Sequence, residues 1–169
     1  DVSARCLSFL KQLNYPEDKN CIERATNYLL SEQEKDGSWF GRWGTNYIYG
    51  TWSVLSALNL VEFRNKKAVF DKAIDYLKSN QRNDGGWGED GKSYYKTFEN
   101  LSKLSTPSQT SWAIMGLLAA GQINSPEVEK GLKYLTNKDT KFQEDHFTAV
   151  GFPRVFYLKY HGYAEYFPL

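Results

Sequence analysis

Apolar side chains recur every three or four residues over most of the chain, which is the spacing of an amphipathic helix. No alternating run of strand length stands out, so the pattern predicts an all-α protein with little sheet. About seven helices are expected. They cover residues 2–13, 22–29, 49–60, 70–77, 112–119 and 127–135, and a last helix whose first turn holds Pro153.

One sequence motif occurs twice in full and once in a degenerate form. The full copies span residues 24–39 and 72–87 and share the pattern (Lys or Arg)-Ala-x-x-Tyr-Leu-x-x-x-Gln-x-x-x-Gly-x-Trp. The third copy begins at Lys130 and keeps its Tyr and Leu, but has Asp139 in place of the Gln and Phe142 in place of the Trp. A period of about 50 residues indicates stacked helical pairs or a closed helical toroid.

The residues of the repeat are placed to join one helix to the next. The Tyr-Leu pair lies one turn before the helix end, where it can pack inward, and the Gly breaks the helix. Gln33 and Gln81 lie close to that end, where an amide can bond backbone groups at the start of the next helix and stack on an indole. Trp39 and Trp87 then fold back over the turn. We therefore interpret Gln33, Trp39, Gln81 and Trp87 as structural residues.

Composition narrows the classes of protein further. The chain has 169 residues, enough for one domain with a core, and its 21 Lys and Arg against 20 Asp and Glu leave a formal net charge of +1. This balance lacks the positive footprint of a nucleic-acid-binding protein. Aromatic residues make up 16% of the chain, an excess that indicates an aromatic-lined surface or cavity.

Residues able to bind a metal or to form disulfides are few. Cys6 and Cys21 do not make a disulfide framework, and they show no metal-ligand spacing with His146 and His161. We therefore expect no metal and no cofactor. The longest apolar run, at residues 112–121, is about half the length of a membrane span.

The motif resembles the QW repeat of the triterpene cyclases, and further segments resemble squalene–hopene cyclases in the order of that family. These segments are Trp-Phe-Gly-Arg-Trp-Gly at residues 39–44, Asn-Tyr-Ile-Tyr-Gly-Thr-Trp at 46–52, Gly-Gly-Trp-Gly-Glu-Asp at 85–90, Ser-Thr-Pro-Ser-Gln-Thr at 105–110 and Gly-Phe-Pro at 151–153. The resemblance covers nearly the whole chain. It implies an α/α barrel, a toroid of helical hairpins, of which residues 1–169 form a single C-terminal fragment and thus a partial barrel.

The resemblance also implies a reaction. Squalene–hopene cyclases fold linear squalene in a large cavity and cyclise it to hopene or hopanol, after an Asp of an Asp-x-Asp-Asp motif protonates the terminal alkene. That motif is absent from this sequence, and in the family it lies upstream of a segment that resembles residues 1–5. We therefore expect no catalytic acid in the chain and no turnover by these residues alone.

Such a cascade moves a carbocation along the hydrocarbon, so the cavity wall must exclude water and still stabilise positive charge. Aromatic faces do both. By correspondence of motifs, the cavity candidates are Trp43, Phe152, Phe156, Tyr160 and Tyr163, followed by Trp87 and Tyr94. The spacing of Phe152, Phe156 and Tyr160 places them on one face of the last expected helix, which is also the pattern of plain core residues.

Four polar residues resemble positions that serve the absent acid. Asp1 and Arg5 correspond to the ends of a family Asp-Val-Thr-Ala-His segment whose His hydrogen-bonds the catalytic Asp. Arg5 replaces that His, and a fixed cation favours the carboxylate and weakens the acid; a plain surface Arg fits the sequence as well. Asn46 and Tyr49 correspond to a segment near the acid, where a hydroxyl could hold the water that reprotonates it. Glu89, in a Gly-rich turn, fits either an exposed helix cap or a residue that positions water.

The resemblance implies the remaining partners. They are squalene as substrate, the N-terminal remainder of the cyclase, and the cytoplasmic side of a bacterial membrane, where a peripheral (monotopic) enzyme draws squalene from the bilayer. A partial barrel exposes apolar faces, so we expect association in isolation, for instance as a homodimer.

Other functions fit parts of the pattern. A protein prenyltransferase β subunit needs a zinc site of Asp, Cys and His, and a thioester-containing toroid needs a Cys-Gly-Glu-Gln segment; the sequence has neither. A non-catalytic helical-toroid fragment or binding module stays as an alternative. So does a cyclase of another polyprene, either a longer one or a diterpene.

Overall fold

The computed structural model describes residues 1–95, 104–137, 144 and 147–169 of the chain. These residues form α-helices, two short 3-10 helices and one two-stranded antiparallel sheet. In chain order the elements are α1 (Val2–Leu13), η1 (Pro16–Asp18), α2 (Lys19–Ser31), α3 (Tyr47–Leu58), α4 (Lys66–Ser79), η2 (Gly91–Tyr94), α5 (Pro107–Ala119), α6 (Pro126–Thr136), β1 (Ala149–Phe152), β2 (Phe156–Leu158) and α7 (Tyr163–Tyr166).

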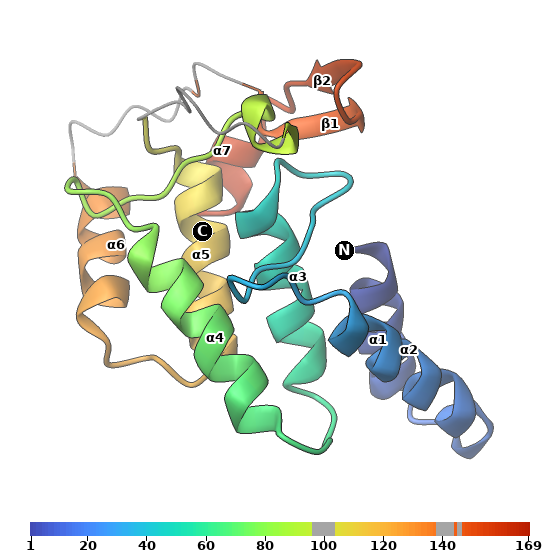
Figure 1. Ribbon diagram of the computed structural model, residues 1–169. Helices are drawn as coiled ribbons and strands as arrows, with labels where there is room; N and C mark the ends of the chain where they lie inside the picture. Colours follow the sequence, from blue (N-terminus) through green and yellow to red (C-terminus); the bar gives the residue numbers. More distant parts are fainter. Residues whose placement is uncertain (96–103, 138–143, 145–146) are drawn as a thin grey trace.

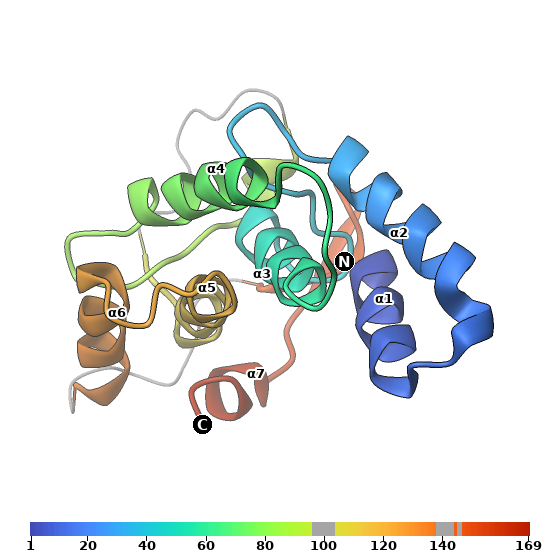
Figure 2. The ribbon, with the colours of Figure 1, turned by 90° about the horizontal axis from the view of Figure 1, so that it is seen from below.

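The helices lie in two layers that together form an arc (Figures 1 and 2). In the inner layer α1 packs against α3 and α3 packs against α5. Each inner helix is followed in the chain by an outer helix, α2, α4 or α6, that packs on it. Figure 2 shows α7 on the opposite side of α5 from the outer layer. This is the architecture of part of an α/α barrel, and the prediction of a mostly helical fold is confirmed.

The two layers differ because their helices are buried to different extents. The inner helices α3 and α5 are covered on most sides, with Leu55, Leu58, Trp112 and Leu117 fully buried. The outer helices bury one stripe, such as that of Leu77 on α4, and expose polar side chains elsewhere. The hydrophobic core therefore lies between the layers and around the inner helices.

The first six predicted helices are confirmed, and side-chain caps define several of their ends. Thr106 and Ser125 each accept a hydrogen bond from a backbone N–H in the first turn of α5 and α6, where a Pro follows directly. Helix α3 begins and ends earlier than the predicted range 49–60. Glu89, from a later turn, bonds the first N–H groups of this helix, which accounts for its earlier start.

The helix expected from Pro153 is wrong, and a β-hairpin takes its place. β1 and β2 pair antiparallel with Phe152 and Phe156 as partners, and Arg154 in the turn has a φ of 67°. The four-residue spacing of the two Phe side chains fits a helix and a tight hairpin equally, so the sequence pattern could not separate them. Tyr160 lies beyond β2 and does not share a helical face with the two Phe residues.

The hairpin is anchored to the loop that precedes α3. Val150 N donates to Trp43 O at 3.0 Å, and Gly44 forms a β-bridge with Ala149. These contacts join two segments that lie far apart in the sequence. A pairing of this kind overrides local helical spacing, because strand formation depends on the partner as well as on the strand itself.

The two full repeats form the same joint between consecutive outer helices. Gln33 Nε2 donates at 3.0 Å to the Gly carbonyl of its own turn and at 3.0 Å to Val69 O in α4. Gln81 Nε2 makes the equivalent bonds at 2.8 Å, the second of them to Glu127 O in α6. Each amide thus bonds backbone groups at the start of the next outer helix, as expected for a structural residue.

The Trp of each full repeat folds back on the helix before it. Trp39 Nε1 donates to Leu29 O, and Trp87 Nε1 donates to Leu77 O, each at 2.7 Å. Both indoles are almost completely buried. The ring fills the space under the turn, and its single donor is satisfied by the last turn of the preceding helix.

A contact between one copy and the next explains the spacing of the repeat. Gly37 and Gly85 have φ values of 93° and 87°, which favour glycine. A Cβ at these positions would also collide with the backbone of Lys72 and Lys130, respectively. These two Lys residues open the second and third copies of the motif. The turn of each full copy therefore packs against the first residue of the following one.

The Tyr residues of the repeat are less uniform than expected. Tyr28 on α2 is half exposed and not packed inward, because α2 forms the edge of the arc (Figure 2). Tyr76 on α4 packs against the core, and the Tyr134 hydroxyl donates at 3.0 Å to a backbone carbonyl before α5. Asp139 and Phe142, the altered end of the third copy, lie outside the described residues.

Candidate functional site

An aromatic cluster lies where α3, α5 and the C-terminal segment meet. The indoles of Trp52 and Trp112 stack in parallel, with centroids 6.2 Å apart. Phe167 packs edge-on against both indoles, at 5.7 and 5.3 Å. Tyr163 and Tyr49 contact Trp112 at 5.9 and 4.9 Å. We call these side chains the inner aromatic cluster.

Two of the cavity candidates meet at this cluster. The ring of Tyr160 lies 5.0 Å from that of Tyr163, and half of Tyr160 is exposed. Burial raises the pKa of Tyr163, so its hydroxyl stays protonated at neutral pH. The pair therefore extends the inner aromatic cluster towards the surface.

Arg5 contacts the cluster from α1. Its Nη2 donates to the Tyr49 hydroxyl at 3.1 Å, and its guanidinium lies over the rings of Tyr49 and Trp52, 5.6 and 5.2 Å from their centroids. A planar cation that stacks on rings and donates from its edge combines two favourable interactions. The structure thus brings together Arg5 and Tyr49, two of the four residues expected to serve the acid.

Asp1 and Asn46, the other two, bond to the protein framework. Asp1 Oδ2 accepts from the backbone N–H groups of Arg42 and Trp43, at 2.9 and 2.8 Å, while Oδ1 caps α1. Asn46 is completely buried, and its amide accepts one hydrogen bond and donates another, both at 3.1 Å. These bonds hold the loop before α3 in place.

Three further cavity candidates gather at the hairpin. The ring centroids of Phe152 and Phe156 are 5.6 Å apart. The guanidinium of Arg42 lies over the rings of Trp43 and Phe152, 4.4 and 5.1 Å from their centroids. We call Trp43, Phe152 and Phe156 the hairpin aromatic group; between 46% and 57% of each residue is exposed. Aromatic residues exposed to this extent are available to a ligand or to another part of a protein.

Trp87 and Tyr94, the remaining candidates, are enclosed by the fold. Trp87 is fully buried in the joint of the second repeat. Tyr94 is 3% exposed, donates to Gly41 O at 2.6 Å and packs edge-on against Phe40. Burial raises the pKa of Tyr94. Their contacts are those of packing residues.

Carboxylates bind the N-terminal ends of the inner helices, and of these Glu144 was not expected from the sequence. Glu89 Oε1 and Oε2 accept from the first two N–H groups of α3, at 2.9 and 3.0 Å. Glu144 Oε1 accepts from Ser108 N in the first turn of α5, at 2.9 Å, and Asp1 caps α1. Glu89 follows the Trp of its repeat at the same distance as Glu144 follows Phe142. Comparison of the repeat copies could therefore have revealed the pair.

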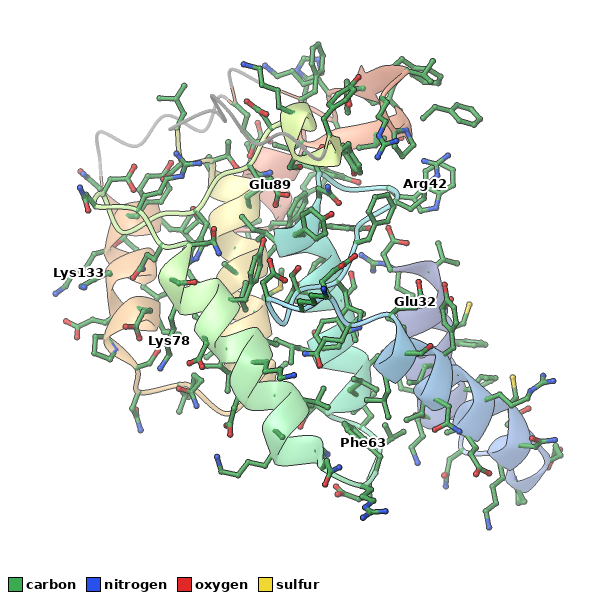
Figure 3. All side chains as sticks on the ribbon, in the orientation of Figure 1. Glu32, Arg42, Phe63, Lys78, Glu89 and Lys133 are labelled. Atoms are coloured by element: carbon green, nitrogen blue, oxygen red, sulfur yellow. The ribbon has the colours of Figure 1, made fainter. Side chains whose placement is uncertain are left out.

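Glu89 was expected either as an exposed cap or as a residue that positions water. It does cap a helix, but it is buried, at 6% exposure, near the upper end of α3 (Figure 3). Burial raises its pKa, and hydrogen bonds from the backbone of Ile48 and Tyr47 counteract this in part. Gln109 secures the Glu89 backbone, because its amide accepts from Glu89 N at 3.0 Å and donates to Glu89 O at 2.7 Å.

A groove of about 990 Å³ opens beside Glu89. It is bordered by the turn of the first repeat, the end of α4, the first turn of α3 and the residues around η2. Acidic side chains such as Glu34 and basic ones such as Arg154 line it together with Tyr rings. Of the cavity candidates Tyr94 alone belongs to this described lining, so the groove is separate from the two aromatic groups.

Metal ligands and membrane-spanning helices are both lacking in the part of the chain that the structure describes. Within residues 1–95, 104–137, 144 and 147–169, no group of His, Cys, Asp and Glu side chains could hold a metal ion. In that same part of the chain, no helix has both the length and the apolar character needed to cross a membrane.

Comparison with known proteins gives the family. Residues 1–169 match the family described as the squalene-hopene cyclase C-terminal domain. A squalene-hopene cyclase of Schizosaccharomyces japonicus is 57% identical over 172 residues, and those of Zymomonas mobilis and Alicyclobacillus acidocaldarius are 50% and 51% identical over 175 and 171 residues. The alignments cover 99–100% of the chain but 26–27% of these relatives, so the chain spans about a quarter of their length. The chain therefore belongs to the squalene-hopene cyclase C-terminal domain family.

Proposed function

We propose that the chain is the C-terminal part of a cyclase and supplies part of the wall of a cavity in which squalene is cyclised to hopene or hopanol. The observation that carries this proposal is the inner aromatic cluster, with Arg5 and Tyr160 attached to it. The squalene-hopene cyclases to which the chain is similar support squalene as the substrate.

The cluster has the properties that such a wall requires. Its rings lie mainly on α3 and α5, whose first turns are held by the Glu89 and Glu144 caps, so the faces are in place before substrate binds. An aromatic face stabilises a desolvated cation by about 2 kcal/mol or more. Unlike a lone-pair donor, it does not capture the carbocation.

Arg5 and Tyr49 belong, in this proposal, beside the initiating acid. Because Arg5 donates to the Tyr49 oxygen, the Tyr49 proton is directed to another acceptor, such as a carboxylate or a water molecule. Tyr49 would hold the water that returns a proton to the acid, and Arg5 would favour the carboxylate form of that acid. We place the acid itself in another part of the cyclase, and we therefore expect no turnover by this chain alone.

The test uses a chimaera in which this chain replaces the C-terminal domain of the Zymomonas mobilis relative. Squalene products are identified by gas chromatography–mass spectrometry. The chimaera should form hopene, and Tyr163→Ala should lower hopene and raise partially cyclised products, because a ring of the wall is lost. Tyr166→Ala is the matched control, since Tyr166 lies on the same helix and is 70% exposed. A folded chimaera that makes no hopene, or a Tyr163 variant with unchanged products, would contradict the proposal.

Membrane association is a separate part of the proposal and rests on the family resemblance. A peripheral enzyme on the cytoplasmic side of a membrane could take squalene directly from the bilayer. Flotation of the chimaera with phospholipid vesicles tests this, and recovery of all the protein in the lipid-free fraction would contradict it.

A further inference from the structure

The loop between the first repeat and α3 holds Arg42 in a defined position. The backbone N–H groups of Arg42 and Trp43 donate to Asp1 Oδ2, at 2.9 and 2.8 Å. On the other side, Trp43 O accepts from Val150 N at 3.0 Å. The loop is therefore tied to the start of α1 and to β1, and this gives the Arg42 side chain a fixed origin.

The guanidinium of Arg42 lies over the hairpin aromatic group. Its Cζ is 4.4 Å from the centroid of Trp43 and 5.1 Å from that of Phe152. Its Nη1 is buried and has no hydrogen-bond partner among the residues that the structure describes. Among the described residues, the positive charge of Arg42 is therefore stabilised by the faces of the Trp43 and Phe152 rings.

We propose that Arg42 is a positioning residue for the hairpin aromatic group, because its guanidinium fixes the planes of Trp43 and Phe152 and occupies one face of each ring. This inference rests on the proposed function, in which these rings form part of the cavity wall. The opposite face of each ring is then the one that meets the substrate. A positive charge on one face weakens the attraction of a ring for a cation on the other, so Arg42 also sets how strongly this wall holds a passing carbocation.

Two substitutions separate orientation from charge. Arg42→Lys keeps the positive charge but loses the flat guanidinium that stacks on a ring. Arg42→Met keeps a long side chain and loses both the flat guanidinium and the charge, so the difference between the two variants reports the charge. Lys66 offers a matched control, because its Nζ lies 6.0 and 5.8 Å from the centroids of Phe63 and Phe70. Figure 3 shows Phe63 at the opposite end of the molecule from Arg42.

The first readout is the product distribution of the complete cyclase, with this chain as its C-terminal part. Arg42→Lys, which loses the orientation of the rings, and Arg42→Met, which loses the orientation and the charge, should each change the ratio of partially cyclised products to hopene about two- to fivefold. Lys66→Met should lower the Tm and leave that ratio unchanged, because its rings are remote from the hairpin. An unchanged ratio in both Arg42 variants, or the same change in Lys66→Met, overturns the proposal.

The second readout does not depend on turnover. The fluorescence of Trp43, obtained as the difference between the cyclase and its Trp43→Phe variant, is quenched with acrylamide. Loss of the guanidinium from the ring face should raise the quenching constant in Arg42→Met and shift the emission to longer wavelength. If the parent cyclase makes no product, the proposed function fails, and the quenching constant still decides the role of Arg42. An unchanged constant overturns that role.

Discussion

Glu89 carries a buried carboxylate whose partners are backbone N–H groups of α3, and this makes stability depend on pH. Burial raises its pKa in the folded state above the ordinary value of 4.5, so the folded protein binds this proton more tightly than the unfolded chain does. The stabilisation that results is complete below the unfolded pKa. It is lost as the pH rises through the folded pKa.

Urea unfolding at a series of pH values measures this effect. The Glu89 contribution to the free energy of unfolding should fall as the pH rises above about 4.5, so Glu89→Gln, which cannot ionise, should lose less stability over that rise than the parent. The variant should also be less stable than the parent at low pH, because an amide cannot accept from both N–H groups of α3 without presenting a donor to one of them. Equal slopes in the two proteins would assign the pH dependence to other groups.

At the scale of the elements, the joint of the repeat determines how successive outer helices are spaced. Gly85 meets two requirements there, a φ of 87° and close contact with the backbone of Lys130. Gly85→Ala should lower the free energy of unfolding by more than about 2 kcal/mol, because the turn must move away from α6. Gly121→Ala is the control: its φ is 76°, but a Cβ there meets nothing within 4 Å, so about 1 kcal/mol is expected. Equal losses in urea unfolding would contradict the contact between copies.

Local periodicity was sufficient for the elements that pack by an amphipathic stripe. The ranges predicted for α1, α2, α4, α5 and α6 all lie within the observed helices, although α4 and α5 begin four and five residues earlier than predicted, and the repeat identified Gln33 and Gln81 as joints. The hairpin was missed because Phe152 and Phe156 keep helical spacing, while the loop at Trp43 that pairs with β1 lies far away in the sequence. Only the folded chain shows that pairing.

The sequence predicted several individual residues of the site but not which of them lie in contact. The resemblance marked Arg5 and Tyr49 independently, and their contact depends on how α1 packs against α3. Trp52, Trp112 and Phe167 were not predicted as cavity residues. The sequence pattern of an aromatic residue in the core is the same as that of one that lines a cavity. Arg42 was missed because its role follows from ring contacts that cross from the loop to β1.

At the scale of the whole molecule, an apolar edge of the arc is uncovered. Val2, Phe9 and Leu13 form one stripe of α1, and each is 40–60% exposed. The chain in isolation should therefore self-associate, and Phe9→Lys should weaken that association by placing a charge in the stripe. Sedimentation velocity over a range of concentrations measures this. Val155→Lys, at a 75% exposed position of the hairpin turn, is the control and should leave the association unchanged. A chain that stays monomeric at high concentration would contradict the prediction.

The most direct test of the central claim compares squalene turnover by three proteins: this chain alone, the upstream part of the Zymomonas mobilis relative alone, and the two joined in one polypeptide. Products are identified by gas chromatography–mass spectrometry. If the chain contributes cavity wall and not the initiating acid, hopene appears from the joined protein and from neither part. Hopene from these 169 residues alone would contradict the account, because a proton donor within the chain would then start the reaction.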